Sequence, residues 1–148
     1  MTYKTPVSVL VVVYRADGQI LLLERAAHPG YWQSVTGSIE TGESLATTAR
    51  REVCEETGIV LTDTDLADWQ LTHHYEIFTE WRHRYAPGVT HNEEHVFSAE
   101  VPANTVIHIA PEEHRAWCWK PWREAAEAVF SWSNRDAIRT LAEQRNFP

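Results

Sequence analysis

The stretch "GSIETGESLATTARREVCEETGI", residues 37–59, constrains the fold and chemistry of this chain more than any other part of its sequence. A helix is expected over residues 44–57, and Gly58 directly after it is a favourable residue for ending a helix. At 3.6 residues per turn, Glu52 and Glu56 stack on one face of this helix, at the edge of its apolar stripe. Stacked carboxylates repel each other, and the cost rises beside a buried surface. A divalent cation with oxygen ligands is the simplest compensation.

The competing explanation is a charged helix face that only keeps the protein in solution. The spacing of the glycines and charged residues bears on this choice. Gly37 is followed by five residues, then Glu43, then seven residues, and then the run "REVCEETGI". This pattern resembles the signature of the Nudix hydrolases at every constrained position. The resemblance favours a metal-binding helix over a solvated one.

The Nudix resemblance implies an enzyme that hydrolyses a diphosphate bond with Mg²⁺ or Mn²⁺ as cofactor. The fold that it implies is an α/β/α sandwich around a mixed β-sheet. By the same resemblance, the metal ligands would be Glu52, Glu56, Glu55 and the carbonyl of Gly37. Arg51 belongs to the same catalytic set and would orient the helix rather than touch the substrate. Hard carboxylate oxygens suit Mg²⁺, which neutralises phosphate charge and lowers the pKa of an attacking water.

Length and composition point to one globular domain. The 148 residues, 43% of them hydrophobic, can form a single core, and no linker or repeat divides the chain. Extended segments are expected at residues 6–14, 19–25, 32–37, 59–61, 69–81, 94–101 and 106–110, with a loop at 82–92. Helices are expected at residues 44–57, 121–130 and 131–145, the last with Ser131 or Ser133 as N-cap. This order predicts one mixed α/β (α+β) domain over residues 1–148.

The charge balance and the cysteines restrict the partners and the compartment. The formal net charge of -8 disfavours binding to nucleic acid, although a bridging cation permits a small anionic substrate. Two cysteines far apart in sequence make no disulfide framework, which favours a reducing compartment. The apolar run at residues 7–13 is too short to span a membrane, and no cleavage site follows it. We therefore expect a cytoplasmic protein without a membrane anchor that acts on a small triphosphate. The sequence does not determine the oligomeric state, for which a monomer is the working expectation.

Several stretches that flank or extend beyond the signature resemble one bacterial branch of the Nudix family, which acts in folate synthesis. They are "KTPVSVLVVVY" (4–14), "WQSVTGSIETGE" (32–43), "EIFTEWRHRYAPGVTHN" (76–92), "EEH" (112–114) and "SWSNRDAI" (131–138). This resemblance implies the conversion of 7,8-dihydroneopterin triphosphate and water to dihydroneopterin monophosphate and pyrophosphate. It would make Glu113 a further metal ligand. It would place the substrate contacts at Lys4, Arg25, Thr36, Tyr75, Glu76, Ile77, Phe78 and Ser131.

The chemistry of these residues can be judged apart from the resemblance. A pterin is flat and carries a dense donor and acceptor edge, so it suits an aromatic slot with a few polar partners. Core packing is the commoner role for each of the candidate aromatic walls, which are Tyr75, Phe78, Trp32 and Trp132. Glu76 would either pair with the pterin edge or lie on the exposed face of a strand. The candidates for holding the outer phosphates are Arg25, Arg82 and Arg84.

Two alternatives remain open on the sequence alone. One is a housekeeping hydrolase of dATP or of an oxidised nucleotide, with the same chemistry and a different preferred substrate. The other is a Nudix-fold module that senses a nucleotide without cleaving it, which usually carries an eroded signature. Glu52, Glu55 and Glu56 are all intact here, which favours an enzyme.

Overall fold

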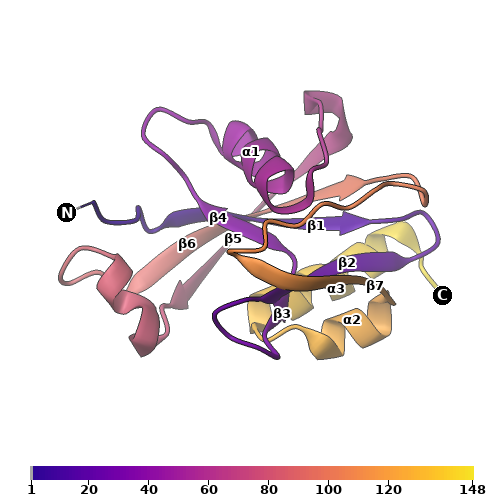
Figure 1. Cartoon of the computed structure of the whole chain (residues 1–148). Coiled ribbons are helices and arrows are strands. Elements are labelled where there is room, and N and C mark those ends of the chain that lie inside the picture. The colour runs from indigo at the N-terminus through magenta and orange to yellow at the C-terminus, as the bar shows by residue number, and fades with distance from the viewer. Residues whose placement is uncertain (1) are drawn as a thin grey trace.

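One mixed β-sheet forms the middle of the molecule in the computed structural model, which describes residues 2–148 (Figure 1). The strands are β1 (Val7–Tyr14), β2 (Gln19–Arg25), β3 (Trp32–Gln33), β4 (Val35–Ser38), β5 (Leu66–Glu76), β6 (His91–Glu100) and β7 (His114–Pro121). Their order is β3-β2-β1-β6-β5, with β4 also paired to β1 and β7 paired to β2. β1 runs parallel to β6, and the other strand pairs are antiparallel.

Helices cover both faces of this sheet. They are α1 (Leu45–Thr57), α2 (Trp122–Ala128) and α3 (Trp132–Arg145), and short 3₁₀ turns span Asp63–Asp65 and Thr79–Arg84. α1 lies on one face, whereas α2 and α3 lie on the other (Figure 1). Alternate residues of β1 divide between the two layers, because Val9 packs in one core with Val53 of α1 and Leu10 packs in a second core with Ile138 of α3. The expected α/β/α sandwich around a mixed sheet is therefore confirmed.

Side-chain caps set the ends of the two longer helices. Ser44 caps α1 by accepting a hydrogen bond from the N–H of Thr47 at 3.1 Å, and Gly58 ends the helix with a φ of 77°. Ser131 caps α3 by accepting from the N–H of Asn134 at 3.2 Å. Each cap satisfies an N–H group that has no partner within its helix. The three expected helices are confirmed, and Ser131 rather than Ser133 is the N-cap.

Two of the expected strands are wrong. Residues 59–61 and 106–110 belong to irregular segments and pair with no strand. Ile59, Leu61 and Ile107 are buried in the core beneath α1, so their apolar character reflects burial and not sheet pairing. A short apolar run fits a buried irregular segment as well as a strand, and its periodicity cannot separate the two.

Other strands also differ from the expectation. The single strand expected at residues 32–37 is split into β3 and β4, which pair with different neighbours. The strand expected at 69–81 ends at Glu76, and the 3₁₀ turn Thr79–Arg84 replaces the end of that strand and the start of the expected loop. The sequence does not predict β7, although this strand pairs along the length of β2. Its half-exposed, tryptophan-rich sequence lacks the alternation that marks a strand.

Candidate active site

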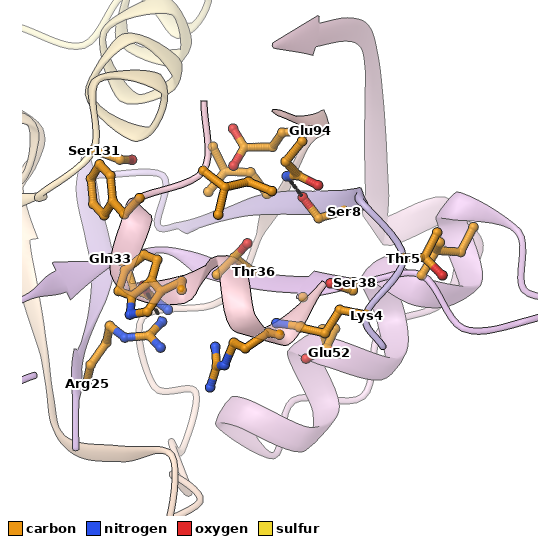
Figure 2. Close-up of a pocket in the computed structure, with 18 of the residues that line it drawn as sticks. Lys4, Thr5, Ser8, Arg25, Gln33, Thr36, Ser38, Glu52, Glu94 and Ser131 are labelled. Atoms are coloured by element: carbon orange, nitrogen blue, oxygen red, sulfur yellow. Dashed lines mark hydrogen bonds between the residues drawn. The ribbon is translucent and has the colours of Figure 1, made fainter. Parts of the chain in front are cut away.

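A cleft of about 1230 Å³ is lined by parts of β1, β4, β5 and β6, by α1 and by the start of α3. The predicted site residues that line it are Lys4, Arg25, Thr36, Gly37, Arg51, Glu52, Glu56, Tyr75, Glu76, Ile77, Phe78, Glu113 and Ser131. Glu55 is the exception, because its side chain is half exposed and lies outside the cleft lining. The fold therefore gathers residues from both ends of the chain, such as Lys4 and Ser131, into one space (Figure 2).

Glu52 and Glu56 form a crowded pair of carboxylates on α1. The Glu56 side chain is 2% exposed, and its Oε1 has no hydrogen-bond partner among residues 2–148. Burial, and then the neighbouring Glu52 carboxylate, raise the pKa of Glu56 well above its ordinary value. Next to this pair, a Cβ added to Gly37 would overlap the Glu52 carboxyl group. A buried acid oxygen without a partner, beside a space that only glycine leaves open, fits a small hard cation.

The pair does not form a closed cage. Within residues 2–148, no three Asp, Glu, His or Cys side chains converge closely enough to hold a metal ion by themselves. Mg²⁺ keeps several of its own waters and commonly binds through one or two carboxylates, so Glu52 and Glu56 fit its usual mode. Partial burial, and then the Glu52 carboxylate, raise the pKa of Glu113, which places Glu113 in the same electrostatic cluster. Its role as a further ligand stays a prediction.

Arg51 braces the carboxylates from the side of the helix. Its guanidinium donates to both oxygens of Glu43, at 2.7 and 2.9 Å, and to Oε1 of Glu52 at 2.7 Å. It also donates to the carbonyl of Ser38 at 3.2 Å and lies 3.3 Å from Glu55. The bidentate pairing lowers the pKa of Glu43 to about 2. Arg51 thus ties α1 to the loop before it and to β4, and its role in orienting the helix stays a prediction.

His114 lies beneath the carboxylate pair without neutralising it. Its Nε2 is 3.8 Å from Oε1 of Glu56 and 3.4 Å from Nε2 of Gln33. Burial, and then the positive charge of Arg25, lower the pKa of His114 to about 4. The imidazole is therefore neutral near pH 7, and it leaves the negative charge of the carboxylates to a ligand.

Three positively charged side chains, those of Lys4, Arg25 and Arg84, line the cleft together with the Glu52 and Glu56 carboxylates. Burial, then Arg84, then Arg25 lower the pKa of Lys4, and burial followed by Arg84 lowers the pKa of Arg25. The backbone holds this group together, because the N–H of Lys4 donates to the carbonyl of Arg84 at 2.8 Å. All three side chains line the cleft, where their mutual repulsion favours a polyanion.

One of the three arginines considered for holding the outer phosphates lies outside the cleft. Arg82 donates from Nε to the carbonyl of Ile77 at 3.0 Å, forms an ion pair with Glu76, and does not line the cleft. Of the three arginines considered, Arg25 and Arg84 remain. The carboxylate of Glu76 is 68% exposed and engaged by Arg82, so its own pairing favours the exposed-strand alternative.

Aromatic side chains line the end of the cleft near α3. Trp132 is 45% exposed and Phe78 is 41% exposed, although both are large apolar groups that would normally be buried. Phe78 is steadied by Trp81 and Phe130, with ring centroids 5.1 and 6.1 Å away. Trp32, by contrast, does not line the cleft and packs against the core beneath α2 and α3. Exposed aromatic faces inside a cleft suit a flat ring.

The cleft also contains a buried polar patch that the sequence patterns do not predict. Asn92 and Glu94 of β6 and Ser8 of β1 all line the cleft and are at most 5% exposed. Asn92 donates from Nδ2 to the hydroxyl of Ser8 at 2.8 Å and to that of Tyr75 at 3.0 Å. One signal was available: Glu94 occupies the same strand phase as Val96, where an apolar residue is expected.

The fold and this arrangement define the class of the protein. Its sequence matches the NUDIX domain family over residues 4–141, and the chain belongs to that family. Two bacterial proteins named dihydroneopterin triphosphate diphosphatase are similar to nearly all of it. The protein of Escherichia coli (strain K12) is 48% identical over 139 residues, which cover 92% of this chain and 91% of the relative. That of Haemophilus influenzae is 39% identical over 142 residues, which cover 94% and 89%.

Solved structures agree with this placement. The structure of the E. coli dihydroneopterin triphosphate pyrophosphohydrolase matches with a TM-score of 0.90 at 44% identity, covering 97% of this chain and 99% of that one. A Caenorhabditis elegans Ap4A hydrolase in a binary complex matches with a TM-score of 0.72 at 18% identity, covering 93% and 96%, and shares the fold. The expected family and fold are confirmed. Separately, none of the helices in residues 2–148 has the length and apolar character needed to cross a membrane.

Proposed function

We propose that this chain hydrolyses 7,8-dihydroneopterin triphosphate to dihydroneopterin monophosphate and pyrophosphate, with Mg²⁺ or Mn²⁺ as cofactor. The observation that carries the proposal is a single cleft with an anion-binding end and an aromatic end. Carboxylates and cations suited to a metal–polyphosphate group lie at one end, and exposed aromatic faces suited to a flat ring lie at the other. Two relatives similar over nearly the whole chain carry names that state this substrate.

The carboxylate end would hold the metal ion. Glu52 and Glu56 would be the main ligands, with Glu113 and the carbonyl of Gly37 beside them and Glu55 acting through water. When bound, the ion neutralises phosphate oxygens and lowers the pKa of the attacking water. A carboxylate of this cluster would take the proton of that water. Arg51 holds Glu52 through a 2.7 Å hydrogen bond and so keeps the ligand set in place.

The remaining cleft residues would bind and orient the substrate. Lys4, Arg25 and Arg84 would hold the outer phosphates through charge-assisted hydrogen bonds. The pterin ring would lie between Trp132 and Phe78, near Thr36, Tyr75 and Ser131. Ser131 uses its oxygen to accept from Asn134, so its hydroxyl hydrogen stays free to donate to a ligand.

We also infer that the protein works as a single chain in the cytoplasm. Cys54 and Cys118 are free thiols, as befits a reducing compartment. Light scattering of the purified protein at assay concentration would show a single-chain mass.

A substrate panel tests the proposed function. Purified protein with Mg²⁺ is given dihydroneopterin triphosphate, dATP and an oxidised nucleoside triphosphate, and pyrophosphate and phosphate release are measured separately. We expect pyrophosphate release with the highest kcat/KM for the pterin substrate. A preference for dATP of about tenfold or more, which is about 1.4 kcal/mol, would replace the pterin assignment with a housekeeping role. Absence of turnover with every substrate would indicate a sensing module.

A further inference from the structure

A row of polar side chains crosses the sheet where the hydrophobic core under α3 ends. In the strand register, Glu94 is the direct partner of His73 on β5 and of Ser8 on β1, and Ser8 is the partner of Ser38 on β4. Partners in register face the same side of a sheet, so these side chains form one line. All but His73 line the cleft. The cleft therefore has a polar floor built by β1, β4 and β6, and His73 of β5 continues the row beyond the cleft lining.

Glu94 is the one carboxylate in this floor, and the surrounding side chains satisfy only part of its hydrogen-bond acceptor capacity. Its side chain is 5% exposed, and its hydrogen-bond partner among residues 2–148 is Nδ1 of His73, at a long 3.4 Å. No arginine or lysine pairs with it in the described part of the chain. A buried carboxylate that has one weak partner retains acceptor capacity for a ligand.

Glu94 lies apart from the residues proposed to bind the metal ion and the phosphates. Figure 2 shows Glu94 and Ser8 on one side of Thr36, and Lys4, Arg25 and Glu52 on the other. His73, which holds Glu94, also packs edge-on against Trp132 with ring centroids 5.2 Å apart. The carboxylate thus lies beside the exposed aromatic wall and away from the metal and phosphate end.

We propose that Glu94 determines substrate specificity by accepting two hydrogen bonds from a ring that presents an N–H group beside an amino group. The pyrimidine half of a pterin has this edge, with the N3–H next to the 2-amino group. The two oxygens of one carboxylate can accept both hydrogens side by side, as they do from an arginine fork. This inference rests on the proposed function and assigns the ring-recognition residue to it.

The same geometry discriminates against adenine. The corresponding edge of adenine carries one amino donor beside a ring nitrogen that is itself an acceptor. A carboxylate would meet that nitrogen lone pair to lone pair, and one of its oxygens would stay buried without a partner. Sites built to hydrogen-bond a specific edge reject analogues that leave such a group unpaired.

The substitution Glu94→Gln tests the proposal because an amide presents one acceptor and one donor. That pattern opposes the pterin edge and matches adenine, which glutamine and asparagine bind in a bidentate way elsewhere. We expect kcat/KM for dihydroneopterin triphosphate to fall about 100-fold or more, since two hydrogen bonds to a charged group are lost. We expect kcat/KM for dATP to stay unchanged or to rise. The fall should come mainly through KM, because Glu94 touches the ring and not the reacting phosphorus.

Glu93→Gln is the matched control. This substitution makes the same chemical change one position earlier on β6. The Glu93 side chain is 42% exposed, pairs with His74 and His95, and does not line the cleft. It should leave both substrates unaffected. Thermal unfolding of the two variants would verify that both are folded. Equal losses for both substrates in Glu94→Gln, or no loss for the pterin substrate, would overturn the assignment of Glu94.

Binding of free 7,8-dihydroneopterin, which lacks the phosphates, separates this inference from the proposed function. Calorimetric titration should show that the wild type and Glu93→Gln bind the ring and that Glu94→Gln binds it at least tenfold more weakly. Wild-type protein that cleaves no pterin triphosphate but binds the ring through Glu94 would refute the proposed function and keep the role of Glu94. If the wild-type protein cleaves the triphosphate but Glu94→Gln binds the free ring as tightly as the wild type, the proposed function is kept and the role of Glu94 is refuted.

Discussion

The Cα of Gly37 lies so close to the carboxylate of Glu52 that no β-carbon fits between them. Gly37 is on β4, opposite Val9 of β1, and Glu52 is on α1. The φ of Gly37 is not positive, so its backbone conformation is open to other residues and the need for glycine there is purely one of space. A signature glycine thus sets how closely a metal-binding helix approaches the sheet.

Gly37→Ala should therefore damage the active site more than the fold. The methyl group would push the Glu52 carboxylate out of position, and we expect kcat/KM to fall about tenfold to a hundredfold, as when groups that orient metal ligands are lost. Gly30→Ala is the control, because Gly30 has a φ of 90° and open space around it. That change should cost about 1 kcal/mol of stability and leave activity intact. Steady-state kinetics together with urea unfolding would distinguish the two, and equal activity losses would refute the steric role of Gly37.

Arg51→Gln should weaken activity and change the response of stability to acid. In the wild type, the pKa of Glu43 is about 2 against an ordinary 4.5. A depressed native pKa contributes stability above the unfolded pKa, and that contribution is lost as the pH falls through the native pKa. The wild type should therefore lose stability between about pH 4.5 and pH 2, and Arg51→Gln should lose less over the same window.

Guanidinium unfolding midpoints of both proteins across that acid window would measure the difference. Arg135→Gln is the control, because Arg135 forms only an exposed ion pair with Asp136 at 3.3 Å. A wild-type profile no steeper than that of Arg51→Gln would show that the bidentate pair with Glu43 carries no such linkage.

The loop and helix of the site could be predicted because their signals are local. Ser44, the spacing of Glu52 and Glu56, and Gly58 each act within a few residues of one another, so the sequence carries them directly. Glu94 could not be predicted in the same way. Its environment comes from β1, β4 and β5, whose register is not contained in the sequence of β6.

The missed strand β7 has a related cause. Its pairing is with β2, which lies nearly a hundred residues earlier in the chain, and its sequence "HRAWCWKP" shows no alternation of polar and apolar residues. The segment around Ile107 is the opposite case, in which a strand is predicted but none forms. Ile107 is buried because it packs beneath α1 and not because it pairs in the sheet. Local patterns report how buried a residue is, whereas pairing partners are set by the whole fold.

Glu56→Gln should abolish turnover and the stabilisation by metal without unfolding the protein. The buried Glu56 carboxylate repels Glu52, so removing its charge should give an unfolding temperature at least as high as that of the wild type when no metal is present. Mg²⁺ at about one hundred times its dissociation constant should stabilise the wild type by about 2.7 kcal/mol and the variant far less. Differential scanning fluorimetry with Mg²⁺ or Mn²⁺ would measure both shifts.

Glu127→Gln on α2 provides the comparison for that experiment, because Glu127 is exposed and does not line the cleft. It should keep the full metal-induced shift. If Glu56→Gln kept that shift as well, the metal would have to bind elsewhere, and the pair of Glu52 and Glu56 would lose its proposed role.

Lys4→Met should raise KM for the triphosphate and weaken its dependence on salt. Lys4 faces Arg25 and Arg84 in the cleft, and the loss of a charge-assisted hydrogen bond to phosphate should raise KM about tenfold or more. Because part of the binding energy is then no longer electrostatic, added KCl should raise KM less steeply than in the wild type. Lys120→Met removes the chain's other lysine, which is on β7 outside the cleft, and should leave both quantities unchanged. Equal effects of the two substitutions would mean that Lys4 acts only through the net charge of the protein, and the three-cation phosphate site would then reduce to Arg25 and Arg84.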